Sequence, residues 1–273
     1  MKLGISLVMG FSDKTNINDF LQLAYKKELS IVELVTEPPF CFVDDLNITQ
    51  RNEIKKLADD LQIELTVHSS FSDINIAAIN ENVRTACVNI IKKSIQFAAD
   101  VNASFVTIHP GERSVGGFYY PDEVKQKNLT SVLEISKFAQ KFNIDIGYEN
   151  FPIMPWELLE ESYVPTLIRE FIEKINLPNL GITWDIGHSN TTKYTLDECY
   201  SNFKDHLFHL HFHDNNGTGS GWLDTHAAVG KGTVDWEKLI ELLKQMNYQR
   251  TCVFELSSIK KIDESLDFLS QYL

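Results

Sequence analysis

Half of the eight histidines of this chain lie in one short segment, together with two aspartates. His209, His211 and His213 alternate with apolar residues, so in an extended strand their imidazoles project from the same face. The Gly-rich loop that follows carries Asp224 and His226. Imidazole nitrogens and carboxylate oxygens are the ligands that zinc and manganese prefer. The segment therefore predicts a divalent metal site where a strand ends.

The length and composition of the chain fit one barrel-sized protein. It has 273 residues, of which 43% are hydrophobic and 23% charged, as in ordinary soluble proteins. Barrels of alternating strands and helices routinely use about 250 residues as one domain, so we expect a single domain over residues 1–273. No apolar run approaches the roughly 20 residues that span a bilayer. The N-terminus lacks a small-residue cleavage site and is interpreted as a first strand.

Cysteine spacing and net charge restrict the location and the partners. The four cysteines form no Cys-x-x-Cys pair, so neither a zinc ribbon nor a disulfide framework is predicted, and a cytoplasmic protein is expected. The formal charge of −13 disfavours nucleic acid as a partner, although a metal-lined cleft could still bind a phosphate locally. No membrane partner is expected, and a homo-oligomer is compatible with the sequence.

Strand-like and helix-like segments alternate along the chain. Good helix formers with helical periodicity occupy, for example, residues 16–29, 48–62, 80–101, 121–142 and 234–246. Asn18-Asp19, Asn80 and Asp235 are candidate N-caps, and Pro121 begins a helix. This order predicts a (β/α)8 barrel; an open doubly wound sheet is the alternative, but no GxGxxG follows an early strand. The eight predicted strands are residues 3–9, 31–35, 63–68, 104–109, 144–149, 180–185, 207–213 and 252–256.

The predicted strands from the third to the eighth all end in or near a residue that can bind metal. In a barrel, the C-terminal ends of the strands converge on the face where active sites lie, so these side chains should meet in one cleft. His188, Asp224 and His226 follow two of these strands and should join them. The strand-end residues are His68, His109, Glu149, Asp185, His211 and Glu255.

A few other residues are weaker candidates. His209 is expected to pack or to support a ligand. Glu33, near the end of an early strand, fits a helix cap as well as it fits the rim. Lys231, in a Gly-Lys-Gly turn, is a candidate substrate contact. Six aromatic residues in rim loops are candidates for the wall of a sugar pocket: Phe71, Phe118, Tyr119, Tyr120, Phe151 and Trp222.

Seven ordered motifs span nearly the whole chain: VHSSFSDINIAA, VTIHPGE, IGYENFP, ITWDIGHSN, HLHFHDNNG, DTHAAVGKGTVDW and VFEL. Together they resemble the xylose isomerase-like TIM-barrel superfamily, which includes sugar phosphate isomerases and epimerases and AP endonuclease family 2 (endonuclease IV). In the isomerases and epimerases, one divalent ion is held by the equivalents of Glu149, Asp185, His211 and Glu255. The equivalent of His188 lies beside the substrate.

The endonuclease IV branch holds three zinc ions, and its nine ligand positions match this chain in residue type. They add His68, His109, His188, Asp224 and His226 to the four ligands above. The surrounding motifs NFPIMP, DIGHSNTT and HFHDNN are more similar to those of the sugar isomerases. The loop after the second strand reads TEPPF and has no Arg, where the endonuclease inserts Arg and aromatic side chains into DNA.

The resemblance therefore implies a metal-dependent isomerase or epimerase of a small sugar or sugar phosphate. Glu149 and Glu255 would exchange protons with carbon, and His188 would hold a substrate hydroxyl. One to three divalent ions are expected, with zinc or manganese ahead of magnesium and cobalt. The alternative enzyme is a multi-zinc phosphodiesterase or AP endonuclease that uses the same cleft. A non-enzymatic metal- or sugar-binding barrel is the third hypothesis, because barrels host many functions.

Overall fold

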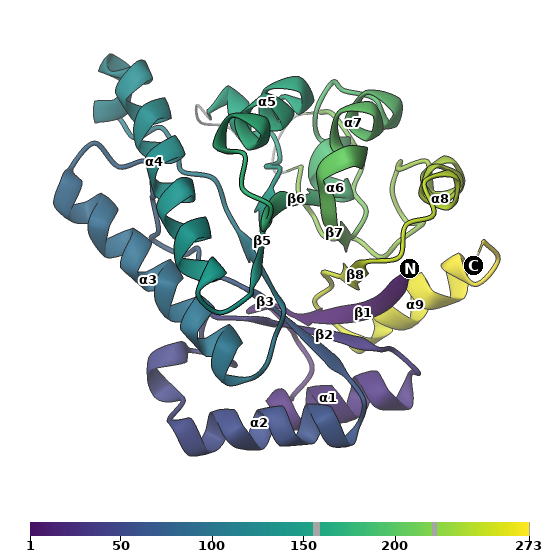
Figure 1. The fold of residues 1–273 in the computed structure, drawn as a ribbon. Helices are drawn as coiled ribbons and strands as arrows, with labels where there is room; N and C mark the ends of the chain where they lie inside the picture. Colours follow the sequence, from purple (N-terminus) through teal and green to yellow (C-terminus); the bar gives the residue numbers. More distant parts are fainter. Residues whose placement is uncertain (155–158, 220–222, 273) are drawn as a thin grey trace.

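The computed structural model describes residues 1–154, 159–219 and 223–272, and it confirms the predicted (β/α)8 barrel. Eight parallel strands pair in chain order, and the pairing of β1 with β8 closes the barrel. The helices surround the strands (Figure 1). The strands are β1 Lys2–Leu7, β2 Ile31–Val35, β3 Glu64–His68, β4 Phe105–Ile108, β5 Asp145–Glu149, β6 Leu180–Asp185, β7 Leu207–Phe212 and β8 Thr251–Phe254.

The helices begin largely where capping residues predict. Asn80 and Asp235 accept hydrogen bonds from backbone N–H groups as N-caps, and Pro121 occupies the first turn of α4. The cap predicted at Asn18-Asp19 is wrong: Asn16 caps α1, because its side chain accepts from the N–H of Asp19. The helices are α1 Ile17–Lys26, α2 Ile48–Asp60, α3 Glu81–Asp100, α4 Pro121–Gln140, α5 Pro165–Ile175, α6 Ile186–Asn190, α7 Leu196–Phe203, α8 Trp236–Gln245 and α9 Ile259–Leu269. The 3-10 turns among the described residues are η1 Val43–Asp45, η2 Gly116–Tyr119, η3 Glu160–Ser162 and η4 Lys204–His206.

Apolar packing joins the helices to the barrel. Each amphipathic helix buries one face: α5, for example, buries Ile168, Phe171 and Ile172. The β-branched residues of the strands provide the matching surface, since a parallel strand buried on both faces is apolar along most of its length. Within the described residues, none of the helices combines the length and hydropathy needed to span a bilayer.

The interior of the barrel also contains a buried polar layer. A charged or polar side chain buried in this way is costly unless it finds a partner. Thr107 and Thr183 hydrogen-bond across the interior at 3.1 Å. Ser6 donates to Glu33 Oε1 at 3.0 Å, and the two residues are also paired in register. This layer provides a polar floor beneath the C-terminal ends of the strands.

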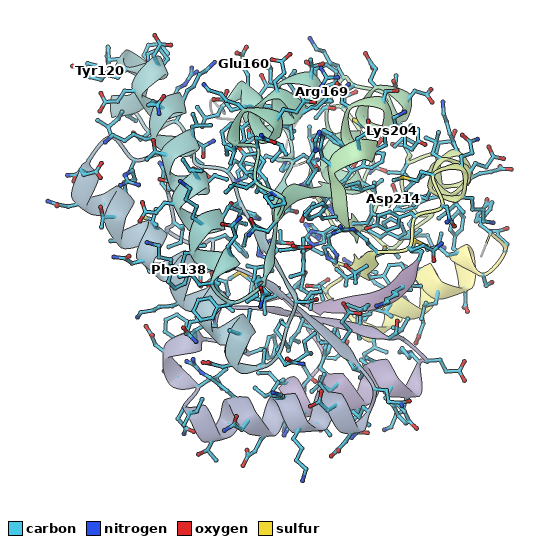
Figure 2. All side chains as sticks on the ribbon, in the orientation of Figure 1. Tyr120, Phe138, Glu160, Arg169, Lys204 and Asp214 are labelled. Carbon is cyan, nitrogen blue, oxygen red and sulfur yellow. The ribbon has the colours of Figure 1, made fainter. Side chains whose placement is uncertain are left out.

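The loop that follows β7 is held by one buried carboxylate. Asp214 lies just past the end of β7 and faces the start of α8 (Figure 2). It accepts hydrogen bonds from the backbone N–H groups of Gly230 and Val234 and from the indole N–H of Trp236. A Cβ at Gly232 would lie 2.2 Å from Asp214 Oδ1, so only glycine fits at that close approach. Asp214 thereby fixes the closing end of the loop that carries Asp224 and His226.

Candidate metal centre

The structure brings the nine candidate ligands together at the C-terminal end of the barrel. Three strands, β3, β5 and β6, end on one of them, and β4 and β8 are directly followed by one. β7 carries one at its penultimate position, α6 contributes one, and the loop after β7 contributes two. In chain order they are His68, His109, Glu149, Asp185, His188, His211, Asp224, His226 and Glu255.

Glu149 is the centre of one half of the cluster. Its carboxylate is fully buried. Oε2 lies 3.1 Å from Nε2 of both His68 and His109, and Oε1 lies 2.9 Å from Nδ1 of His211. His211 Nδ1 is also 3.4 Å from Glu255 Oε1. One carboxylate therefore faces three imidazoles from three different strand ends, which is a suitable arrangement for a ligand shared by neighbouring ions.

Asp224 is the centre of the other half. Its Oδ2 lies 3.1 Å from Nε2 of His226 and 3.4 Å from Nε2 of His188. His213 Nε2 lies 3.6 Å from Asp224 Oδ1 and 2.9 Å from Asp185 Oδ1. His213 is not among the nine predicted ligands, although it lies in this half of the cluster. The alternation of His209, His211 and His213 was the available signal, since in an extended segment it places all three side chains on the same side.

Three histidines are oriented by backbone carbonyl groups. The Nδ1 atoms of His68, His188 and His226 lie 2.8–2.9 Å from the carbonyl oxygens of Ser69, Asn150 and Glu255. A carbonyl can only accept, so each Nδ1 must carry the hydrogen and each Nε2 faces the cluster. Metal-binding histidines commonly donate their other ring N–H in this way, so the three rings fit ligands of a divalent ion.

The described residues contain four groups whose ligand atoms lie within 4.8 Å of one another and could each hold a metal ion. Three of these groups are linked through Glu149 or His211, as expected for a centre with several ions, and the fourth shares no residue with them. The donors are nitrogen and oxygen atoms, which suit divalent zinc or manganese. The groups are Glu149, Asp185, His211 and Glu255; His68, His109 and Glu149; His188, His213, Asp224 and His226; and Glu33, His209 and His211.

Mutual attraction compensates for the burial of these charges. Burial alone would raise the pKa of Glu149, but the charge of His211 and hydrogen bonds from neighbouring histidines hold that pKa well below its usual value. Burial disfavours the charged form of His68, yet its hydrogen bond to Glu149 raises the His68 pKa to about 9. His226 has a pKa of about 9 for the same reason, with Asp224 as its partner. Burial lowers the pKa of His109 to about 4.

These pKa values predict that zinc binding releases protons. At neutral pH the ion-free protein holds His68 and His226 as imidazolium groups, since both pKa values are about 9. Each must lose a proton before Nε2 can bind an ion. Zinc affinity should therefore rise with pH up to about 9 and then level off. Calorimetric titration in buffers of different ionisation enthalpy measures the released protons; equal heats in all buffers would contradict these two ligand assignments.

A cavity of about 400 Å³ opens above the cluster. This volume is typical of small-molecule sites, which span roughly 300–1,000 Å³. Seven of the nine candidate ligands line it, whereas Asp185 and His211 lie deeper. Phe71 and Phe151, two of the six candidate aromatic residues, also line it. Phe71 is held there because Glu37 accepts hydrogen bonds from the N–H groups of Phe71 and Ser72, both at 2.7 Å.

Several predicted pocket residues lie elsewhere. Phe118, Tyr119 and Tyr120 are 57%, 75% and 58% exposed and do not line the cavity. Figure 2 shows Tyr120 beside the start of α4, at the outer edge of the molecule. Their loop extends outward before α4 instead of folding over the barrel. Lys231 is exposed and is also absent from the lining, because its turn packs against Asp214, just past β7, and against α9. Trp222 lies outside the described residues.

Glu33 lies in the middle of β2, not near its end, and is fully buried. Its carboxylate lies 3.4 Å from Nε2 of both His209 and His211. His209 Nδ1 in turn lies 2.6 Å from Thr251 Oγ1. Glu33 therefore contacts the far side of the His211 ring, below the rim. A carboxylate in the middle of the apolar run IVELV was the available signal, since it requires a buried partner.

The chain is thus a closed parallel (β/α)8 barrel with His, Asp and Glu side chains clustered at the C-terminal ends of its strands, in groups that could hold metal ions. The chain belongs to the family described as Xylose isomerase-like TIM barrel, whose model matches residues 21–272. Relatives of this family include sugar epimerases and endonuclease IV.

Individual relatives include proteins of both branches. An uncharacterized protein of Methanocaldococcus jannaschii is 32% identical over 222 residues, which cover 81% of this chain and 73% of the relative. A probable endonuclease 4 of Halothermothrix orenii is 25% identical over 209 residues, covering 67% of this chain and 69% of the relative. The crystal structure of a D-tagatose 3-epimerase-like protein superposes with a TM-score of 0.87 at 28% identity, covering 100% of this chain and 97% of the other.

Proposed function

We propose that this chain is a metal-dependent isomerase or epimerase of a small sugar or sugar phosphate. One observation carries the proposal: ligand atoms of Glu149, Asp185, His211 and Glu255 lie within 4.8 Å of one another beneath a cavity of small-molecule size. The similarity to a D-tagatose 3-epimerase-like protein supports the same chemistry. Zinc and manganese suit these ligands best.

The residues of the chain would divide the reaction among them. A divalent ion held by Glu149, Asp185, His211 and Glu255 would polarise the substrate carbonyl and so increase the acidity of the adjacent C–H group. One of the two glutamates, Glu149 or Glu255, takes that proton as the C–H bond breaks. The other glutamate returns a proton to carbon, so the net change is a rearrangement of the same atoms.

His188 would orient the substrate. Its ring lines the cavity, and its Nδ1 donates to the Asn150 carbonyl, which fixes the ring orientation. Burial would lower the pKa of His188, but the charges of Asp185 and Asp224 hold it well above its usual value. His188 can therefore donate a hydrogen bond to a substrate oxygen while the glutamates exchange the proton.

Solvent deuterium exchange tests the proposal even when the product of the reaction is not identified. The protein, loaded with manganese or zinc, is incubated in D2O with free ketohexoses and their phosphates, and NMR detects deuterium at carbon next to the carbonyl. Exchange that requires the added metal is the expected result. If no sugar or sugar phosphate exchanges above the metal-only control, the isomerase assignment is wrong.

A multi-ion phosphodiesterase is the second candidate, and the Asp224 half of the cluster favours it. Asp224, His188, His213 and His226 form a group that the four ligands of an isomerase site do not need. The similarity to a probable endonuclease 4 points the same way. In that chemistry several ions neutralise the charge that develops on phosphorus.

Duplex DNA should bind only weakly at physiological salt. The formal net charge of −13 gives the surface few cations to replace the counterions of a phosphate backbone, and counterion release drives most DNA affinity. A fluorescence anisotropy titration of an abasic-site duplex, with and without zinc, measures this. Tight, salt-sensitive binding with strand cleavage would favour the phosphodiesterase over the isomerase.

A further inference from the structure

The wall of the cavity above the cluster differs from its floor of candidate ligands because it is mostly apolar. Apart from the candidate ligands, most of its lining is apolar, and Glu112 and Ser257 are the polar side chains there among the described residues. Ser257 Oγ accepts a hydrogen bond from Lys261 Nζ at 3.1 Å. The apolar lining residues are Val8, Met9, Val35, Phe71, Phe151, Pro152 and Met154.

Glu112 is held at the cavity by its backbone. Its N–H donates to Asn75 Oδ1 at 3.0 Å, and its carbonyl accepts from Asn75 Nδ2 at 2.9 Å. The preceding Gly111 donates to Asn128 Oδ1 and packs so tightly that a Cβ there would lie 2.3 Å from Ala77 Cβ. The loop after β4 therefore has little freedom to move Glu112 away from the cavity.

The Glu112 carboxylate itself has no hydrogen-bond or ion-pair partner within the part of the chain that the structure describes. Partial burial raises its pKa, as expected for a carboxyl group facing apolar walls without a cation. The fixed backbone keeps this unpaired carboxylate available to a ligand in the cavity. Such a group accepts hydrogen bonds and donates none when it is ionised.

No lysine or arginine lines the described cavity, and residues 155–158, 220–222 and 273 contain none either. Lys261 lies behind Ser257, where its ammonium group donates to the carbonyl of His226 and to Ser257 Oγ. Arg113, next to Glu112 in the chain, is also absent from the lining. The imidazolium groups of His68 and His226 are already paired with Glu149 and Asp224. A phosphate ester would thus bring two negative charges toward Glu112 with no lysine or arginine of the lining to receive them, which disfavours its binding.

We propose that Glu112 is a specificity-determining residue that accepts a hydrogen bond from a substrate hydroxyl, and that the site takes a free ketose in preference to its phosphate ester. The inference rests on the proposed isomerase function. The apolar walls, with Phe71 and Phe151 among them, pack against the C–H groups of the sugar. Glu112 then supplies an acceptor on the wall, apart from the ligand cluster on the floor.

The test compares free D-fructose, D-psicose and D-tagatose with their 6-phosphates in the deuterium-exchange assay with manganese. The unmutated protein should exchange the free sugars with the higher kcat/KM. Because the charged acceptor becomes a neutral amide oxygen, which accepts a weaker hydrogen bond, Glu112→Gln should raise KM for the best free sugar about tenfold and change kcat much less. Glu112→Lys should raise that KM further and shift the preference toward the phosphate.

Two controls make the result specific. Glu53→Gln removes an exposed carboxylate from α2 and should leave both constants unchanged. Lys261→Met should leave the free-sugar KM within about twofold, whereas a large rise in KM for the phosphates would show that Lys261 receives the phosphate. Thermal unfolding of each variant confirms that it is folded.

The possible failures can be told apart. Exchange of phosphates in preference to free sugars, or an unchanged KM in Glu112→Gln, would overturn the role of Glu112 while the isomerase function stands. If Glu112→Gln lowered kcat and kcat/KM by the same factor and left KM unchanged, the role of Glu112 would be overturned too, because that pattern belongs to a residue of the proton-transfer step. Absence of exchange with any compound would overturn both the function and the inference.

Discussion

Replacing Glu255 by glutamine is expected to lower turnover of the preferred sugar by about a thousandfold while the barrel stays folded. Glu255 follows β8, is 6% exposed, and its Oε1 lies 3.4 Å from His211 Nδ1. Glutamine has nearly the same shape, so packing changes little. The amide, however, cannot accept a proton at neutral pH and is a poor ligand, so both the proton transfer and the metal site are impaired.

The deuterium-exchange assay and an unfolding curve measure the two halves of this prediction. Glu53→Gln is the matched control: it replaces an exposed carboxylate on α2 and should keep full turnover. Glu255→Asp keeps the charge but shortens the side chain, and we expect intermediate turnover. If Glu255→Gln turned over sugar at a near-normal rate, Glu255 would not be the proton-transfer residue and the mechanism would need another base.

The positions of the strand-end residues could be predicted from the sequence because the geometry of a barrel largely determines where the strand ends lie. Once eight alternating units are recognised, the carboxyl ends of parallel strands must converge. Glu149 and Asp185 therefore follow from chain order alone, before any distance is measured. The same geometry explains why His213 could have been included: it directly follows β7 and continues the alternation of His209 and His211.

Other parts of the site could not be predicted, because they depend on how deep a residue lies in the barrel and on the direction of a loop. The periodicity of the sequence determines neither. Glu33 has the same inward direction as a rim residue but lies in mid-strand, so only the register shows that it contacts the far side of His211. Tyr120 and Lys231 lie in loops whose direction is set by local hydrogen bonds and packing. Glu112 comes four residues after Ile108, the last residue of β4, and only the shape of the cavity shows that Glu112 lines it.

The number of ions is the other property on which the structure makes a strong prediction. Four protein ligands already satisfy one ion with room for substrate oxygens, so a single ion would leave four further candidate ligands without a function. These residues are buried or half-buried, and they contact carboxylates of the cluster. We therefore expect at least two divalent ions, zinc or manganese, per chain at saturation. The four residues are His68, His109, Asp224 and His226.

The double variant His109→Ala with His226→Ala should lower the metal content and leave the ion on Glu149, Asp185, His211 and Glu255 in place. His109 contacts Glu149 and His226 contacts Asp224, so the two substitutions affect separate groups of ligands. Elemental analysis after saturation and desalting gives the stoichiometry. His206→Ala is the matched control, because His206 lies in η4 with Glu173 as its partner and belongs to none of the four ligand groups.

One ion per chain in both the unmutated protein and the double variant would contradict this expectation. His109 and His226 would then be substrate contacts or structural residues, because nothing would be lost when they are removed. A site with one ion lacks the second charge that a phosphodiesterase uses against its substrate. That outcome would therefore weaken the phosphodiesterase and leave the isomerase, with its four ligands, as the function that the cluster supports.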